Sequence, residues 1–138
     1  MAAYNKFNSF VENIAEKVHN LGSDSMKVML TNTAPVATNT VFANLTDLST
    51  SGGYTAAGAA VTITSSAQTT GTYKLILVDV VFTATTGFGP FRYVVLYNTT
   101  ATNGELIGWW DYGSGVTLLA LETFTVDFDA AAGVLTIA

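Results

Sequence analysis

Two aspartates near the C-terminus form the pattern in this chain that comes closest to catalytic or metal chemistry. Asp127 and Asp129 stand two residues apart, so their side chains share one face of a strand. Paired carboxylates can hydrolyse glycosidic bonds, and clustered carboxylates can bind calcium. The residues that follow, Ala130 to Gly133, offer no further oxygen-bearing side chain for such a site. We therefore predict a solvated strand face here, with no catalytic residue and no metal ligand.

Histidine and cysteine chemistry is nearly absent from the sequence. His19 is the only histidine, and no Ser or Asp stands at a recognisable nucleophile spacing from it. We predict a helix-capping or surface role for it. The chain has no cysteine, which excludes disulfides and thiolate metal sites. Its glycine-rich segments precede strands or loops rather than a helix, so they predict turns and not a phosphate site, and we expect no cofactor.

Aromatic side chains are the remaining candidates for binding. Trp109 and Trp110 are adjacent, and Tyr93, Tyr97 and Tyr112 stand near them in sequence. Such a group can form a platform for sugars. Adjacent residues of a strand point to opposite faces, however, so we expect one tryptophan in the core and one available for an interface.

The composition points to a protein that packs against copies or partners. The 138 residues correspond to one domain, of which 49% are hydrophobic and only 11% charged. A surface with so little charge favours association. The net charge is −5 and the five cationic residues are scattered, which argues against nucleic acid and anionic membranes as partners. No signal peptide or membrane span is apparent, so we expect synthesis in a cytoplasm.

The first 24 residues are expected to form an amphipathic helical arm on a body that comprises residues 25–138. One apolar stripe at helical spacing predicts a helix from Asn5 to Leu21, with Asn5 as N-cap and Gly22 just past its end. The residues of the stripe are Phe7, Phe10, Val11, Ile14, Val18 and Leu21. Whether this stripe packs on its own body or on a neighbouring molecule is left open by the sequence.

The body has the pattern of an antiparallel β protein. Short apolar or alternating runs recur about every ten residues between Gly- and Asn-rich turns. Thr33 to Leu48 reads as a surface excursion with at most one short strand near 40–43, and Gly113 to Gly115 as a turn. We predict a mainly β fold, an antiparallel β-sandwich or jelly-roll-like barrel with one N-terminal α-helix. The predicted strands are 26–32, 60–68, 72–84, 91–98, 105–111, 122–128 and 134–137.

Several segments together resemble a family of small virion structural proteins of tailed bacteriophages. They span nearly the whole chain but include no catalytic motif, so the resemblance carries over no functional residue. It implies a capsid decoration, or cement, protein that sits on the outside of the head, often as a trimer, and bridges major capsid proteins. The segments are Tyr4 to Glu12, Val18 to Leu21, Leu30 to Pro35, Gly89 to Asn98, Leu106 to Gly113 and Phe124 to Phe128.

We therefore expect a homo-oligomeric virion component, a trimer, on the capsid surface. It would act by burying apolar area across the joints between capsid subunits. Large aromatic side chains dominate the energetics of interfaces, so they are the first candidates for this contact. The candidate interface residues are Tyr4, Phe7, Phe10, Trp109 and Trp110.

Two other functions remain open. One is a tail or fibre component that binds a host-surface glycan through exposed aromatic side chains. The other is a small glycosidase or esterase that uses Asp127 and Asp129, which the scarcity of His, Arg and Cys disfavours.

Overall fold

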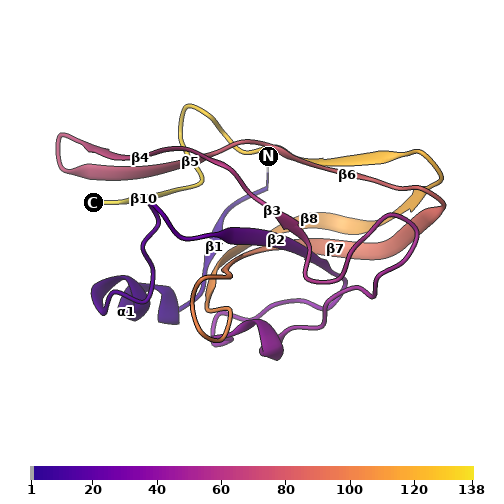
Figure 1. Cartoon of the computed structure of the whole chain (residues 1–138), viewed down its shortest axis with the longest axis horizontal. Coiled ribbons are helices and arrows are strands. Elements are labelled where there is room, and N and C mark those ends of the chain that lie inside the picture. Colours follow the sequence, from indigo (N-terminus) through magenta and orange to yellow (C-terminus); the bar gives the residue numbers. More distant parts are fainter. Residues whose placement is uncertain (1) are drawn as a thin grey trace.

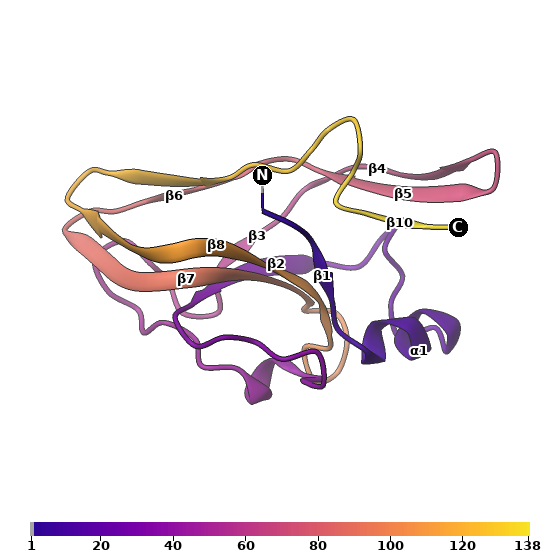
Figure 2. The same cartoon turned by 180° about the vertical axis from the view of Figure 1, so that it is seen from behind.

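The computed structural model describes residues 2–138, and its antiparallel strands form two layers (Figures 1 and 2). One layer is a five-stranded sheet in the order β1-β8-β7-β2-β3. The other consists of a three-stranded sheet, β10-β5-β4, and the pair β6-β9, which lie end to end on one side of the large sheet. The predicted mainly β sandwich with one N-terminal α-helix is confirmed. The bounds are β1 Asn5–Lys6, α1 Ser9–Ala15, β2 Met26–Thr31, the 3-10 helix η1 Phe42–Asn44, β3 Ala59–Ala60, β4 Ile63–Thr69, β5 Thr72–Leu77, β6 Val80–Thr83, β7 Gly87–Asn98, β8 Leu106–Leu119, β9 Thr123–Val126 and β10 Leu135–Ile137.

The large sheet is covered on both faces along residues 94–98 of β7, which explains the apolar run of this strand. Val94 and Leu96 point into the core between the two layers, whereas Val95 and Tyr97 point to the opposite face. A strand covered on both faces reads as a near-continuous apolar segment rather than an alternating one. β7 is also the strand that pairs with both β2 and β8, so it holds the centre of the sheet.

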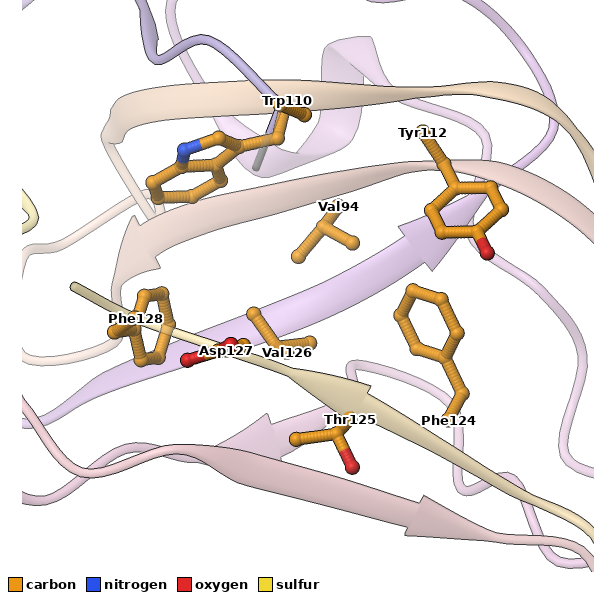
Figure 3. A pocket seen from close by; sticks show the side chains of 9 residues that line it. Val94, Trp110, Tyr112, Phe124, Thr125, Val126, Asp127 and Phe128 are labelled. Atoms are coloured by element: carbon orange, nitrogen blue, oxygen red, sulfur yellow. The ribbon is translucent and has the colours of Figure 1, made fainter.

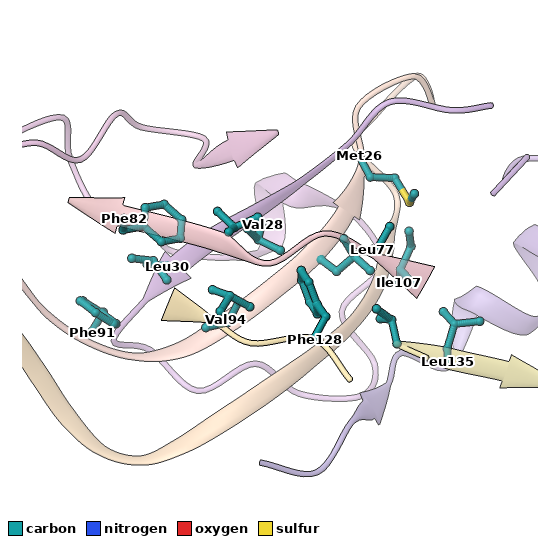
Figure 4. Packing of buried hydrophobic residues seen from close by; sticks show 14 of the residues in the cluster. Met26, Val28, Leu30, Leu77, Phe82, Phe91, Val94, Ile107, Phe128 and Leu135 are labelled. Carbon is teal, nitrogen blue, oxygen red and sulfur yellow. The ribbon is translucent and has the colours of Figure 1, made fainter. Parts of the chain in front are cut away.

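Two hydrophobic clusters fill the space on either side of this sheet. The larger one lies between the layers and draws on β2, β5, β6, β7 and β8 as well as the C-terminal segment (Figure 4). The smaller one, around Phe7, Met29 and Leu106, is covered by Phe42 and Leu45 of the excursion between β2 and β3. Each fully buried Phe, Leu or Met contributes about 1.5–3 kcal/mol, so both clusters hold the chain together.

The N-terminal helix is much shorter than the apolar stripe predicts. Asn5 is not an N-cap, because β1 pairs it with Trp109 at the edge of the large sheet. The helix ends before Lys17, which adopts a left-handed φ of 65°. The N–H of Val18 donates to the carbonyl of Asn13 at 2.8 Å, which is the long hydrogen bond of a Schellman cap. A lysine therefore takes the position that the prediction gave to Gly22.

Several predicted boundaries in the body also shift. The strand predicted over 72–84 is broken at Val78 and Asp79, which separate β5 from β6. The predicted turn at Gly113 to Gly115 lies inside β8, where five steps from Asp111 to Val116 face two steps of β7. The residues therefore belong to a large irregular bulge within one long strand. The excursion at 33–48 is confirmed, but its predicted short strand is an isolated bridge at Val41 followed by η1.

Candidate functional site

An open apolar cavity of about 170 Å³ lies between β8 and β9 (Figure 3). Trp110 and Tyr112 extend into it from β8, and Phe124 and Val126 extend from β9. We call this cavity the aromatic slot and define it by Val94, Trp110, Tyr112, Phe124, Val126 and Phe128. Its walls are aromatic and its floor is aliphatic, so it is suited to bind an apolar group.

The period of the two strands places these side chains. Trp110 and Tyr112 stand two residues apart on β8, and Phe124, Val126 and Phe128 alternate with exposed residues and all pack in or against the larger cluster. The Trp110 and Phe128 rings lie 5.8 Å apart at one side. The Tyr112 and Phe124 rings lie 5.5 Å apart at the other. Both contacts are edge-to-face, an arrangement that contributes about 0.5–1.5 kcal/mol beyond area burial and holds the walls in place.

The slot is open because both strands beside it run along an uncovered side of the sandwich. β1 pairs with β8 only at Gly108 and Trp109. Within residues 2–138, β9 pairs with β6 and with no other strand. Tyr112 is consequently 57% exposed, although its ring packs against Phe124.

The rim of the slot is acidic on the side of Asp127. This exposed residue also borders a second hollow, which Asp79 and Asp129 line as well. The Asp79 carboxylate accepts the N–H of Phe128 at 2.8 Å. The Asp129 carboxylate accepts the N–H groups of Ala132 and Ala131, and these two hydrogen bonds lower the pKa of Asp129.

Asp127 and Asp129 are exposed, as predicted, but they follow the end of β9 instead of sharing a strand face, and they differ in role. Asp129 orders the turn that follows β9, whereas Asp127 lies at the mouth of the slot. Across residues 2–138, no three His, Asp or Glu side chains are grouped so that they could hold a metal ion.

The predicted interface residues occupy different environments. Phe7 and Phe10 are buried in the chain's own core, so their side chains lie away from any surface that a partner could contact. Phe7 packs 4.5 Å from the ring of Trp109. Tyr4 is half-buried, and its ring lies 5.5 Å from that of Trp110. These two phenylalanines of the apolar stripe therefore pack on the body of their own chain and not on a neighbouring molecule.

The two tryptophans face opposite sides of the sheet, as predicted from their adjacency. Trp109 packs against the smaller cluster and Trp110 against the larger one, and both are half-buried. Only Trp110 lines the slot. Sequence reasoning did not assign Val94, Phe124 or Phe128 to a site, because nothing local shows that β8 and β9 face each other across an open edge.

His19 is buried rather than at the surface, which corrects the prediction. It is 5% exposed, and its Nδ1 lies 2.9 Å from the amide nitrogen of Asn98. The same amide donates to the Asp24 carboxylate at 2.6 Å, and the Asn98 oxygen accepts the N–H groups of Thr100 and Ala101. Since that oxygen is occupied, the Asn98 nitrogen faces the imidazole, and Nδ1 of His19 is an acceptor. Desolvation by burial lowers the pKa of His19, against the opposing effect of Asp24. These bonds attach the segment after α1 to the end of β7.

No protein-family model, curated protein or solved structure matches this chain. None of the helices within residues 2–138 has the length and apolar character needed to cross a membrane. The fold and the slot define a β-sandwich with a recessed apolar surface, and its function is inferred from its own residues and geometry.

Proposed function

We propose that this protein is a structural component of a tailed-bacteriophage virion, a decoration protein that binds the outside of the capsid. In this proposal it assembles as a trimer, bridges neighbouring major capsid proteins and is made in the host cytoplasm. The observation that carries the proposal is the aromatic slot, an open apolar recess at the side of the β-sandwich. The family resemblance of the segments described above supports the same assignment.

Other exposed apolar side chains add to the surface available for association. Leu119 and Leu121, at the turn between β8 and β9, are 66% and 81% exposed. Val81 of β6 is exposed as well, and Tyr112 stands at the slot. Large exposed apolar side chains are suited to interfaces, and the chain carries little charge to oppose association.

The mechanism is binding rather than bond chemistry. Each Å² of apolar surface removed from water contributes about 25 cal/mol, and a copy that touches two capsid subunits opposes their separation. Many copies on one shell act together, so individually weak contacts give a large total effect.

Cosedimentation of the purified protein with undecorated phage heads, with light scattering of the protein alone, tests the proposal. We expect saturable binding and a defined oligomer. Tyr112→Ala should weaken head binding, whereas Val11→Ala, a matched exposed site on α1, should not. A monomer that does not bind heads would contradict the assignment.

A glycan-binding tail or fibre component is the second candidate. The slot favours it in one respect, because aromatic side chains stand beside the Asp127 carboxylate and the Thr125 hydroxyl. Binding on a glycan array that is lost in Trp110→Ala would support this function, and a blank array would contradict it.

A further inference from the structure

We propose that the aromatic slot binds a polypeptide segment in which a bulky apolar side chain stands next to a lysine or arginine. The apolar side chain fills the slot and the cationic group meets Asp127 at its rim. This inference rests on the proposed function and specifies the chemistry of the partner segment, which belongs to a different protein rather than to a second copy of this chain.

The size and walls of the slot select the apolar part. Its volume of about 170 Å³ is close to that of engineered apolar cavities, about 150 Å³, that take up a benzene molecule. A single Leu, Met or Phe side chain matches this space. The floor, formed by Val94 and Val126, has no polar side-chain atom, so the group at the bottom must be apolar.

The charges around the rim select the cationic part. Asp127 borders both the slot and the hollow that holds Asp79 and Asp129. Lys74 is the cation that acts on Asp129, and its ammonium group donates to the carbonyl of Ala131 at 2.7 Å. This region therefore carries three carboxylates and one lysine. A basic partner segment is complementary to such an acidic surface.

The chain's own exposed apolar side chains do not fit that description. Leu121 is followed by Glu122, Val11 by Glu12 and Val78 by Asp79. None of the large exposed hydrophobic residues described within residues 2–138 has a lysine or arginine as its sequence neighbour. A second copy that inserted Leu121 would bring Glu122 towards Asp127, which like-charge repulsion opposes.

A sugar fits the slot less well than a peptide. Sugars require several hydrogen-bonding groups, but the polar side-chain groups that line the slot are few, on Trp110, Tyr112, Thr125 and Asp127. The Trp110 ring is also in contact with both Tyr4 and Phe128, which leaves it little free face for stacking.

Panning a random heptapeptide display library on the intact protein tests this inference. We expect the selected peptides to pair Leu, Met or Phe with an adjacent Lys or Arg. The best synthetic peptide is then titrated while tryptophan fluorescence and amide NMR shifts are followed. Asp127→Asn should weaken its binding by about two- to fivefold at low salt, with the difference lost at high salt.

Matched variants separate the two halves of the site. Glu16→Gln, at the exposed C-cap of α1, changes the net charge equally and should leave the peptide affinity unchanged. Tyr112→Ala should weaken binding, and Tyr112→Phe should restore it because the ring contact with Phe124 is kept.

Selected peptides without a basic residue, unchanged affinity in Asp127→Asn, or the selection of no peptide would each overturn the inference. Glycan binding that competes at the slot would overturn it as well. Head cosedimentation of the same variants keeps the two proposals distinct. Wild-type binding to heads without peptide selection overturns only the slot inference, whereas a selected peptide motif without head binding overturns only the capsid assignment.

Discussion

Truncation of the buried amide side chain of Asn98 should lower the free energy of unfolding substantially. The amide is fully buried and uses all of its hydrogen-bonding capacity, with two donor contacts to His19 and Asp24 and two acceptor contacts from Thr100 and Ala101. Asn98→Ala removes all four contacts at once. Two of these bonds join segments 79 and 74 residues apart, so their loss falls on the tertiary structure, whereas the other two order the turn that follows β7.

The magnitude follows from what each partner loses. His19 Nδ1 stays buried without a donor, which costs about 1–3 kcal/mol. Asp24 is only half-buried, so water replaces part of its lost bond, at a cost of about 1 kcal/mol. Thr100 is an exposed residue, so water replaces much of the bond that its N–H loses. We expect a loss of about 3 kcal/mol in the free energy of unfolding, or a fall in Tm of about 10 °C for a chain of this length.

Urea unfolding followed by tryptophan fluorescence measures this loss. Asn32→Ala, at an exposed position just after β2, is the matched control and should stay within about 0.5 kcal/mol of the wild type. A loss below about 1 kcal/mol in Asn98→Ala would refute the reasoning, since it would mean that solvent replaces the amide at a site described as buried.

Three further predictions can be checked by the same unfolding measurement. Because burial lowers the pKa of His19, its contribution to stability is complete above its unfolded pKa of about 6.5 and is lost as the pH falls through that value; His19→Gln should remove this dependence, and an equal slope in both proteins would argue against it. Phe7→Ala should lower the free energy of unfolding by about 3–5 kcal/mol, whereas Val11→Ala, at a 55% exposed position of the same stripe, should lower it by less than about 0.5 kcal/mol. Similar losses in the two variants would contradict this structure and favour one continuous helix with a single buried face. Gly58→Ala should cost about 3 kcal/mol or more, because a Cβ at this φ of +86° would lie 1.9 Å from the Val28 carbonyl oxygen, and a neutral result would show that β2 and β3 can separate freely.

Features with a local cause were predictable from the sequence. The strand at Met26–Thr31 follows from a short apolar run, and the alternation around Phe124 to Phe128 follows from a period of two residues; each segment carries its own signal. The class of fold follows from many such segments separated by turn residues. The opposite orientation of Trp109 and Trp110 has the same local origin.

Boundaries were less predictable, because tertiary partners compete with local propensity. The stripe from Phe7 to Leu21 has helical spacing, yet β8 takes Asn5 and Lys6 into the sheet. Gly113 to Gly115 has the composition of a turn, but the flanking residues of β8 both pair with β7, so the strand continues through a bulge. Pairing with another strand satisfies more backbone groups than the local alternative, and it decides the outcome.

By itself, then, the sequence determined the β class, the faces of individual strands and the scarcity of reactive side chains. Only the tertiary structure decided that Phe7 and Phe10 are internal, that His19 is buried against Asn98, and that Trp110 and Phe124 form one slot. The physical reason is that burial and cavities depend on which surfaces cover one another. In this fold the slot is open because β1 pairs with only two residues of β8. The number of residues over which two distant segments pair cannot be predicted from the sequence of either segment alone.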